Sequence, residues 1–98
     1  MDQIERIARM EAIYNAGLAA VSGLEQALER YAALREDLAA LESYYQSPVW
    51  RQDFENDEAV ALPPDLPRGV LSEDAVYDLL TAQDELLERM RALLVLPR

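Results

Sequence analysis

The middle of the chain carries the residues whose types and spacing come closest to a chemical site. Asp53, Glu55 and Asp57 occupy the first, third and fifth positions of a calcium-loop pattern, and Ca²⁺ and Mg²⁺ prefer hard oxygen ligands. The sixth position is Glu58 where the loop needs Gly, and the twelfth is Pro64 where it needs Glu. On a helix the three acids would also point in diverging directions. We therefore expect no metal site and interpret the run as a solvated acidic face.

The residue types that build most catalytic sites are missing from the sequence. It contains no His, no Cys and no Lys, which removes the commonest general base, thiolate zinc sites, Schiff-base chemistry and the phosphate-loop lysine. A carboxylate pair such as Asp53 and Asp57 acting with Tyr77 is the one arrangement left, without any nucleophile motif beside it. We expect no enzyme activity and no cofactor.

The charge of the chain limits its partners. Nineteen acidic residues against nine arginines give a net charge of −10, which repels nucleic acid and anionic lipid and attracts basic surfaces. The start of the sequence has no basic and apolar leader, and no apolar run reaches the length of a membrane span. We expect a cytoplasmic protein that binds neither nucleic acid directly nor membranes.

The 98 residues are enough for one domain, and the patterns predict an all-α fold. Apolar heptad spacing without Pro predicts a first helix over about 2–45. Ser-Pro predicts a short middle helix over 48–58, followed by an extended Pro-rich loop over 59–71. Ser72, as an N-cap, opens a closing helix over about 72–95. The closing helix would pack as an antiparallel helical hairpin or as part of a three-helix bundle.

The first helix is longer than the closing helix that would cover it. At 1.5 Å per residue the two span roughly 65 Å and roughly 35 Å. Either the first helix bends back between Gly17 and Gly23, or two chains pair to cover the remainder. We favour a continuous helix and a homodimer, whose predicted face consists of Ile4, Ile7, Met10 and Tyr14.

The aromatic residues of the middle segment allow two interpretations. Trp50 and Phe54 fall on one helical face, so they either pack into the core or form an exposed anchor for a partner, and we favour packing. Packed, they would hold the Pro-rich loop across the helices as a belt. Arg68 either pairs with nearby acids or helps form an anion site, and Gly69 would make a positive-φ turn. The candidate belt or interaction residues are Trp50, Asp53, Phe54, Asp57, Glu58, Arg68 and Gly69.

Two stretches of the sequence carry a family resemblance. WRQDFENDE over 50–58 and LPPDLPRGVLSEDAVYDLL over 62–80 resemble the small bacterial proteins grouped as domain-of-unknown-function family 4298. The likeness extends to the long first helix and the Leu-rich closing helix. It implies a helical, bacterial protein and no particular activity, substrate or cofactor.

These observations favour a non-catalytic protein–protein interaction module or adaptor. The first alternative is an acidic competitor that imitates nucleic acid and binds a basic protein. Its acids, however, are scattered and do not form paired rows. The second alternative is a small carboxylate-based protein that binds divalent metal.

Overall fold

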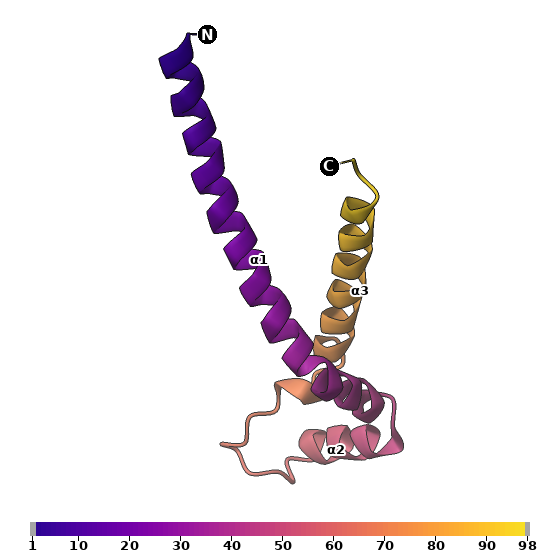
Figure 1. Cartoon of the computed structure of the whole chain (residues 1–98). Coiled ribbons are helices and arrows are strands. Elements are labelled where there is room, and N and C mark those ends of the chain that lie inside the picture. Colours follow the sequence, from indigo (N-terminus) through magenta and orange to yellow (C-terminus); the bar gives the residue numbers. More distant parts are fainter. Residues whose placement is uncertain (1, 98) are drawn as a thin grey trace. The chain divides into compact units, whose positions relative to one another are not determined.

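The structure, a computed structural model that describes residues 2–97, is all-α, as predicted. Its elements are α1 (Gln3–Tyr45), α2 (Pro48–Glu58), the short 3₁₀ helix η1 (Gly69–Leu71) and α3 (Ala75–Leu94), with no strand among the described residues (Figure 1). A long first helix, a short middle helix and a closing helix are all present, which confirms the predicted fold class.

The helix α1 runs without a break through both glycines. Asp2 caps its start, because the Asp2 carboxylate accepts a hydrogen bond from the backbone N–H of Glu5 at 2.7 Å. Gly17 and Gly23 lie inside the helix with open space around their Cα atoms. The bend considered between these glycines does not occur, since the helix-forming residues on either side compensate for two weak helix formers.

The chain divides into two compact units, Met1–Glu36 and Asp37–Arg98. In its described part the first, here the N-terminal unit, is a single helix. The second, here the C-terminal unit, contains the last turns of α1 together with α2, η1 and α3. Among its described residues, the buried side chains are Trp50, Leu71 and Val76, one from each of α2, η1 and α3.

The helix α2 begins as the sequence predicts and ends in an unexpected way. Ser47 is its N-cap, accepting from the Trp50 backbone N–H at 3.3 Å, and Pro48 occupies the first turn. At the other end Val60 N–H donates to Asp57 C=O and Ala61 N–H donates to Asn56 C=O, the pattern of a Schellman motif. Val60 takes the left-handed conformation with φ 57°, a position that usually holds Gly.

Two predictions about the start of the closing helix are wrong. Gly69 does not make a positive-φ turn; it begins η1. Ser72 does not cap α3, because its N–H bonds to the Gly69 carbonyl and its backbone is extended, so Ser72 ends η1. Asp74 precedes α3 in its place, and its carbonyl accepts the first helical bond from Asp78 at 2.8 Å. The 3₁₀ turn thus occupies the last residues of the predicted loop.

Candidate functional site

The N-terminal unit presents an apolar face. Large apolar side chains recur along it and remain between 43% and 79% exposed, because a single helix has nothing within the unit to pack against. The predicted dimer-face residues Ile4, Ile7, Met10 and Tyr14 all belong to this set. Its ten members in the described part of the unit are Ile4, Ile7, Met10, Ile13, Tyr14, Leu18, Val21, Leu24, Leu28 and Leu34.

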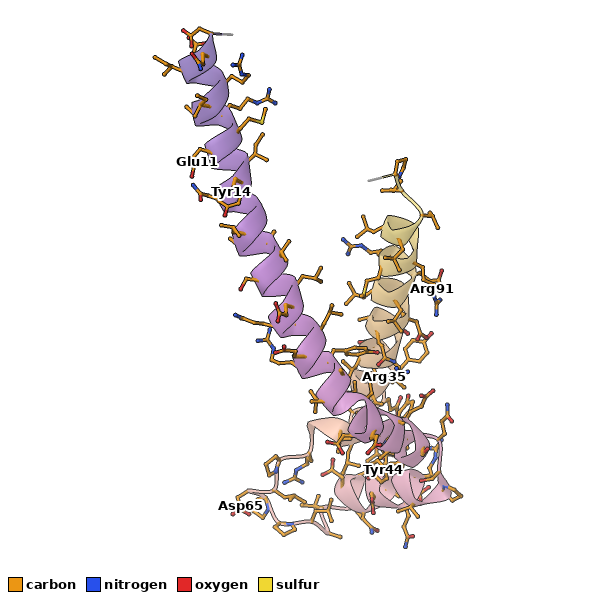
Figure 2. All side chains as sticks on the ribbon, in the orientation of Figure 1. Glu11, Tyr14, Arg35, Tyr44, Asp65 and Arg91 are labelled. Carbon is orange, nitrogen blue, oxygen red and sulfur yellow. The ribbon has the colours of Figure 1, made fainter. Side chains whose placement is uncertain are left out.

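Two hollows on this face repeat at heptad spacing. The first, of about 370 Å³, is lined by Arg6, Ile7, Met10, Glu11 and Tyr14, and the second, of about 310 Å³, by Tyr14, Gly17, Leu18 and Val21. Glu11 and Tyr14 can be located on α1 in Figure 2. Apart from Arg6, each residue of the first hollow has its counterpart seven positions later in the second. The apolar face is therefore a regular surface with a helical period, suited to receiving side chains of another helix.

Charge is distributed unevenly between the two units. Residues 1–36 contain six acidic and four basic side chains, whereas residues 37–98 contain thirteen acidic and five basic. The apolar face therefore lies on a nearly balanced helix, and most of the negative charge of the chain belongs to the C-terminal unit.

An aromatic cluster forms the centre of the C-terminal unit. The Trp50 ring stacks on Phe54 and meets the edge of Tyr45, each at a centroid distance of 5.2 Å. Trp50 is only 7% exposed, and its indole N–H donates to the Val70 carbonyl at 2.9 Å. A buried indole with its donor satisfied fits a packing role, so the structure places Trp50 in the core and not on the surface as an anchor.

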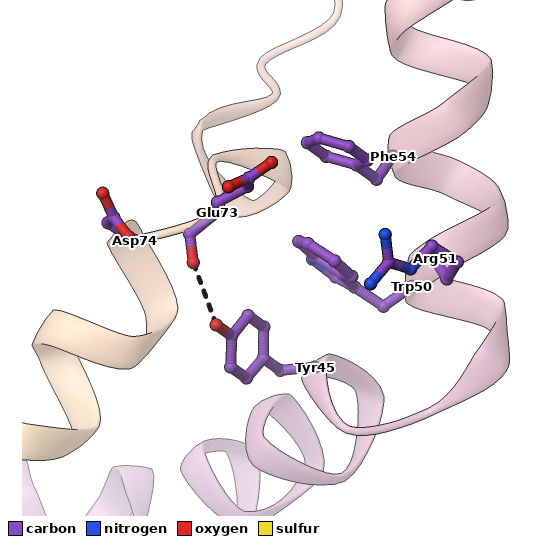
Figure 3. A pocket seen from close by; sticks show the side chains of 6 residues that line it. All are labelled: Tyr45, Trp50, Arg51, Phe54, Glu73 and Asp74. Atoms are coloured by element: carbon purple, nitrogen blue, oxygen red, sulfur yellow. Dashed lines mark hydrogen bonds between the residues drawn. The ribbon is translucent and has the colours of Figure 1, made fainter.

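An open cleft of about 450 Å³ lies beside this cluster. Figure 3 shows the Tyr45 hydroxyl at its edge, donating to the Glu73 backbone carbonyl at 2.9 Å, and thereby joining the end of α1 to the segment before α3. The cleft has charged groups of both signs and aromatic rings, without a Ser, Thr or Asn among its lining residues. These are Tyr45, Trp50, Arg51, Phe54, Glu73 and Asp74.

Asp53 is engaged by a tyrosine. The Tyr44 hydroxyl donates to the Asp53 carboxylate at 2.7 Å. That hydrogen bond, followed by partial burial and by repulsion from the Asp53 charge, raises the pKa of Tyr44 to about 12 from its usual 10.0. At neutral pH Tyr44 is thus a neutral donor that fixes α2 against the end of α1, not an acid–base group.

Asp57 is engaged by Arg68, as one interpretation of that arginine predicts. The guanidinium lies 2.6 Å from the Asp57 carboxylate and also donates to the Pro63 carbonyl at 2.8 Å and the Leu66 carbonyl at 3.3 Å. One side chain therefore ties the Pro-rich loop to α2. Leu66, a residue of that loop, has a side chain that is 45% exposed, so hydrogen bonds and the ion pair hold this part of the loop more than apolar packing does.

The acidic run does not assemble a cation site in the described part of the chain. No group of three or more acidic side chains over residues 2–97 is arranged to hold a metal ion. Asp53 and Asp57 are bonded to Tyr44 and Arg68, while Glu58 is exposed. Two of the acids named from the sequence thus have structural partners.

The family assignment rests on a sequence match that extends over both units. A family model described as a domain of unknown function (DUF4298) matches residues 7–93. The chain belongs to the DUF4298 family. The matched range includes nearly all of the apolar face and the whole aromatic cluster of this DUF4298 protein. No curated protein and no solved structure matched the chain.

Several structural residues of the DUF4298 chain were not found from the sequence. Tyr44 and Tyr45 lie three and two residues before the Ser47 cap, and an aromatic pair close to a helix start is the signal that would have indicated contact with that helix. Val60 carried no such signal. Among the described residues, no helix is long and apolar enough to span a membrane.

Proposed function

We propose that this DUF4298 protein is a non-catalytic protein–protein interaction module of the cytoplasm that pairs as a homodimer through the apolar face of its N-terminal unit. The observation that carries the proposal is the run of exposed apolar side chains from Ile4 to Leu34 on one helix. Extended exposed apolar patches on proteins mark interaction surfaces.

The energetics support pairing of this face. Fully burying one Leu or Ile side chain contributes roughly 1.5–3 kcal/mol, and a pair has ten such side chains on each copy, so burying half of this apolar surface contributes roughly 15–30 kcal/mol against a cost of roughly 4–15 kcal/mol for bringing two chains together. A helix face with two open hollows suits the side chains of another helix better than a small molecule, since small-molecule sites are enclosed. A dimer formed in this way would act as an adaptor by presenting its two C-terminal units.

Ile7→Asp tests the pairing. Ile7 is 57% exposed, so a carboxylate there is harmless in a single chain and becomes a buried charge in a pair. We expect light scattering at micromolar concentration to give the mass of two chains for the unsubstituted protein and of one chain for Ile7→Asp, with unchanged helical circular dichroism. Ala12→Asp, on the same helix at a position outside both hollows, is the matched control and should stay dimeric. A single-chain mass for the unsubstituted protein contradicts the homodimer.

The second candidate function is binding of a basic protein by the C-terminal unit. The specific observation in its favour is that thirteen of the nineteen acidic residues belong to this unit, against five basic ones. Such binding depends on charge and weakens as salt shortens the Debye length. Capture of partners by tagged protein at low and high salt distinguishes the two functions. Partners retained at high salt and lost with Ile7→Asp support the apolar face, whereas salt-sensitive capture of nucleic-acid-binding proteins supports the acidic competitor.

A further inference from the structure

The direction in which two copies pair follows from the arrangement of the apolar face, and this inference rests on the proposed homodimer. We infer that the two N-terminal units pair antiparallel, with Met10 of each copy level with Leu28 of the other and Gly17 level with Val21 of the other.

The two hollows identify the occupant as a helix with the same spacing. In packed helix pairs, a side chain of one helix enters a hole formed by four side chains of the other. Both hollows contain such a set at positions i, i+3, i+4 and i+7, and the second lies seven residues after the first. A helix filling both must offer apolar side chains at heptad spacing. The same face of this chain offers them, so a second copy fits.

Gly17 favours the antiparallel direction. In a parallel pair each residue at the contact between the two helices faces the same residue of the other copy, so Gly17 would face Gly17. Nothing in the chain lies within 4 Å of the space that a Cβ would fill at Gly17. Two glycines facing each other would therefore leave a void. In the antiparallel pair Val21 of the second copy lies opposite Gly17 and fills the second hollow. Tyr14 then faces Leu24, so each of these layers contains at least one large side chain.

The charge of the C-terminal units favours the same direction. A parallel pair would place both strongly acidic units at one end of the paired helices. Antiparallel pairing in this register places residue 37 of the two copies roughly 54 Å apart along the helix axis, far beyond the Debye length of about 8 Å at physiological salt. The points at which the two acidic units begin are then too far apart to repel each other.

One charge contact opposes this arrangement and supplies a test. Glu11 borders the first hollow, and in the antiparallel register it lies near Glu25 of the second copy, whereas in a parallel pair it would lie near Arg6. An exposed contact between charges changes the stability of the pair by less than a void between the two helices does. The antiparallel pair is therefore the more stable one despite the repulsion, and removing that repulsion should strengthen it.

Cysteine cross-linking can determine the direction of pairing, and no native thiol can form a competing disulfide, because the sequence contains no Cys. Met10→Cys and Leu28→Cys proteins, carrying tags of different mass, are mixed, allowed to exchange and oxidised. We expect the mixture to give a disulfide-linked species with both tags, and each variant alone to give none. Cross-linking of Met10→Cys to itself would overturn the antiparallel direction while leaving the homodimer in place. A monomer that still captures another protein through Ile7 would overturn the second copy as occupant and leave the interaction function in place.

Glu11→Lys provides the second measurement, with Glu29→Lys as the matched control that makes the same charge change away from the hollows. In the antiparallel pair the introduced ammonium group would lie near Glu25, and we expect the dimer dissociation constant to fall by about threefold or more relative to the control. A rise in that constant indicates proximity to Arg6 and a parallel pair. A constant equal to that of the control also contradicts the predicted contact between Glu11 and Glu25.

Discussion

The described part of the N-terminal unit buries none of its large apolar side chains, whereas the C-terminal unit buries three of them and leaves others exposed, among them Leu79, Leu86 and Leu93 on α3. Both contain regularly spaced apolar residues on helices, but Val21 and Leu24 of the first are more than half exposed while Val76 of the second is 3% exposed. The difference in burial arises because the chain reverses direction only in the C-terminal unit. After position 45 it turns around Ser47 and again along the Pro-rich loop, so Trp50 of α2 and Val70 of η1 come into contact. Apolar spacing therefore predicts a face, and only a returning chain or a second chain covers it.

The difference extends to polar bonds. In the C-terminal unit the Tyr44, Tyr45, Trp50 and Arg68 side chains all bond to groups distant in the sequence. In the N-terminal unit the bonds from Glu5 to Asp2 and from Asn15 to Glu11 connect residues three or four apart, which only support the helix. The C-terminal unit thus has tertiary structure to lose, and the following changes measure how much.

Truncation of Trp50 to Ala should produce the largest effect. It removes the stacking with Phe54, the edge contact with Tyr45 and the bond to Val70, and large core deletions cost about 3–5 kcal/mol. Urea unfolding measures the loss. Val21→Ala, at a side chain 66% exposed, should change stability by under about 0.5 kcal/mol when measured at a concentration where the protein is monomeric. Equal losses for the two variants would break the contrast between the units.

Arg68→Met should cost about 1–2 kcal/mol. Methionine keeps much of the aliphatic stem but removes the ion pair with Asp57 and the bonds to the Pro63 and Leu66 carbonyls. Both charged side chains are only about a quarter exposed, at 28% and 25%, so water replaces these bonds incompletely. Limited proteolysis should cut faster within residues 59–68 than in the unsubstituted protein. Arg91→Met, at an exposed pair with Glu88, is the control and should leave both measurements unchanged.

Tyr44→Phe should cost about 1 kcal/mol at neutral pH and change the response to alkali. Because folding raises the Tyr44 pKa from 10.0 to about 12, the contribution of this group is fully present below pH 10 and is lost as the pH rises from 10 to 12. The stability difference between the two proteins should therefore be constant below pH 10 and shrink above it. Tyr77→Phe, at a side chain 60% exposed, is the control and should leave the stability at neutral pH unchanged. A constant difference up to pH 12 would contradict the role assigned to the Asp53 bond.

Val60→Gly should have the smallest effect and the opposite sign. Val60 adopts φ 57° at the end of α2, where a β-branched residue is strained, and its side chain is 82% exposed, so little packing is lost. Glycine should relieve the strain and stabilise the protein by about 0.5–1 kcal/mol, raising the urea midpoint. Val60→Ala separates the causes, because alanine removes the branch but keeps a Cβ and should gain less. A lower midpoint for Val60→Gly would mean that the valine side chain has a contact worth more than its strain.

The sequence by itself determined the helices and the charge. Absence of Pro from residues 2–45 permits one long helix, Ser47 and Pro48 start the next, and three prolines between positions 62 and 68 forbid a helix there. These are local effects of backbone geometry, which depend only on residues that are close in the sequence. The heptad spacing also predicted the apolar face of the first helix, and the side chains of that face are exposed in the structure.

Only the tertiary structure decided the partners of the polar groups and the turns. Val60, not Gly69, takes the positive φ, because the chain must leave α2 at that residue to carry the Pro-rich loop toward η1. Asp53 and Asp57, interpreted from the sequence as part of a solvated acidic face, instead bond to Tyr44 and Arg68, which lie nine and eleven residues away. Such contacts depend on which segments fold back onto each other. Residue spacing along one helix shows which face is apolar, but it does not show which segments of the same chain fold back onto that face.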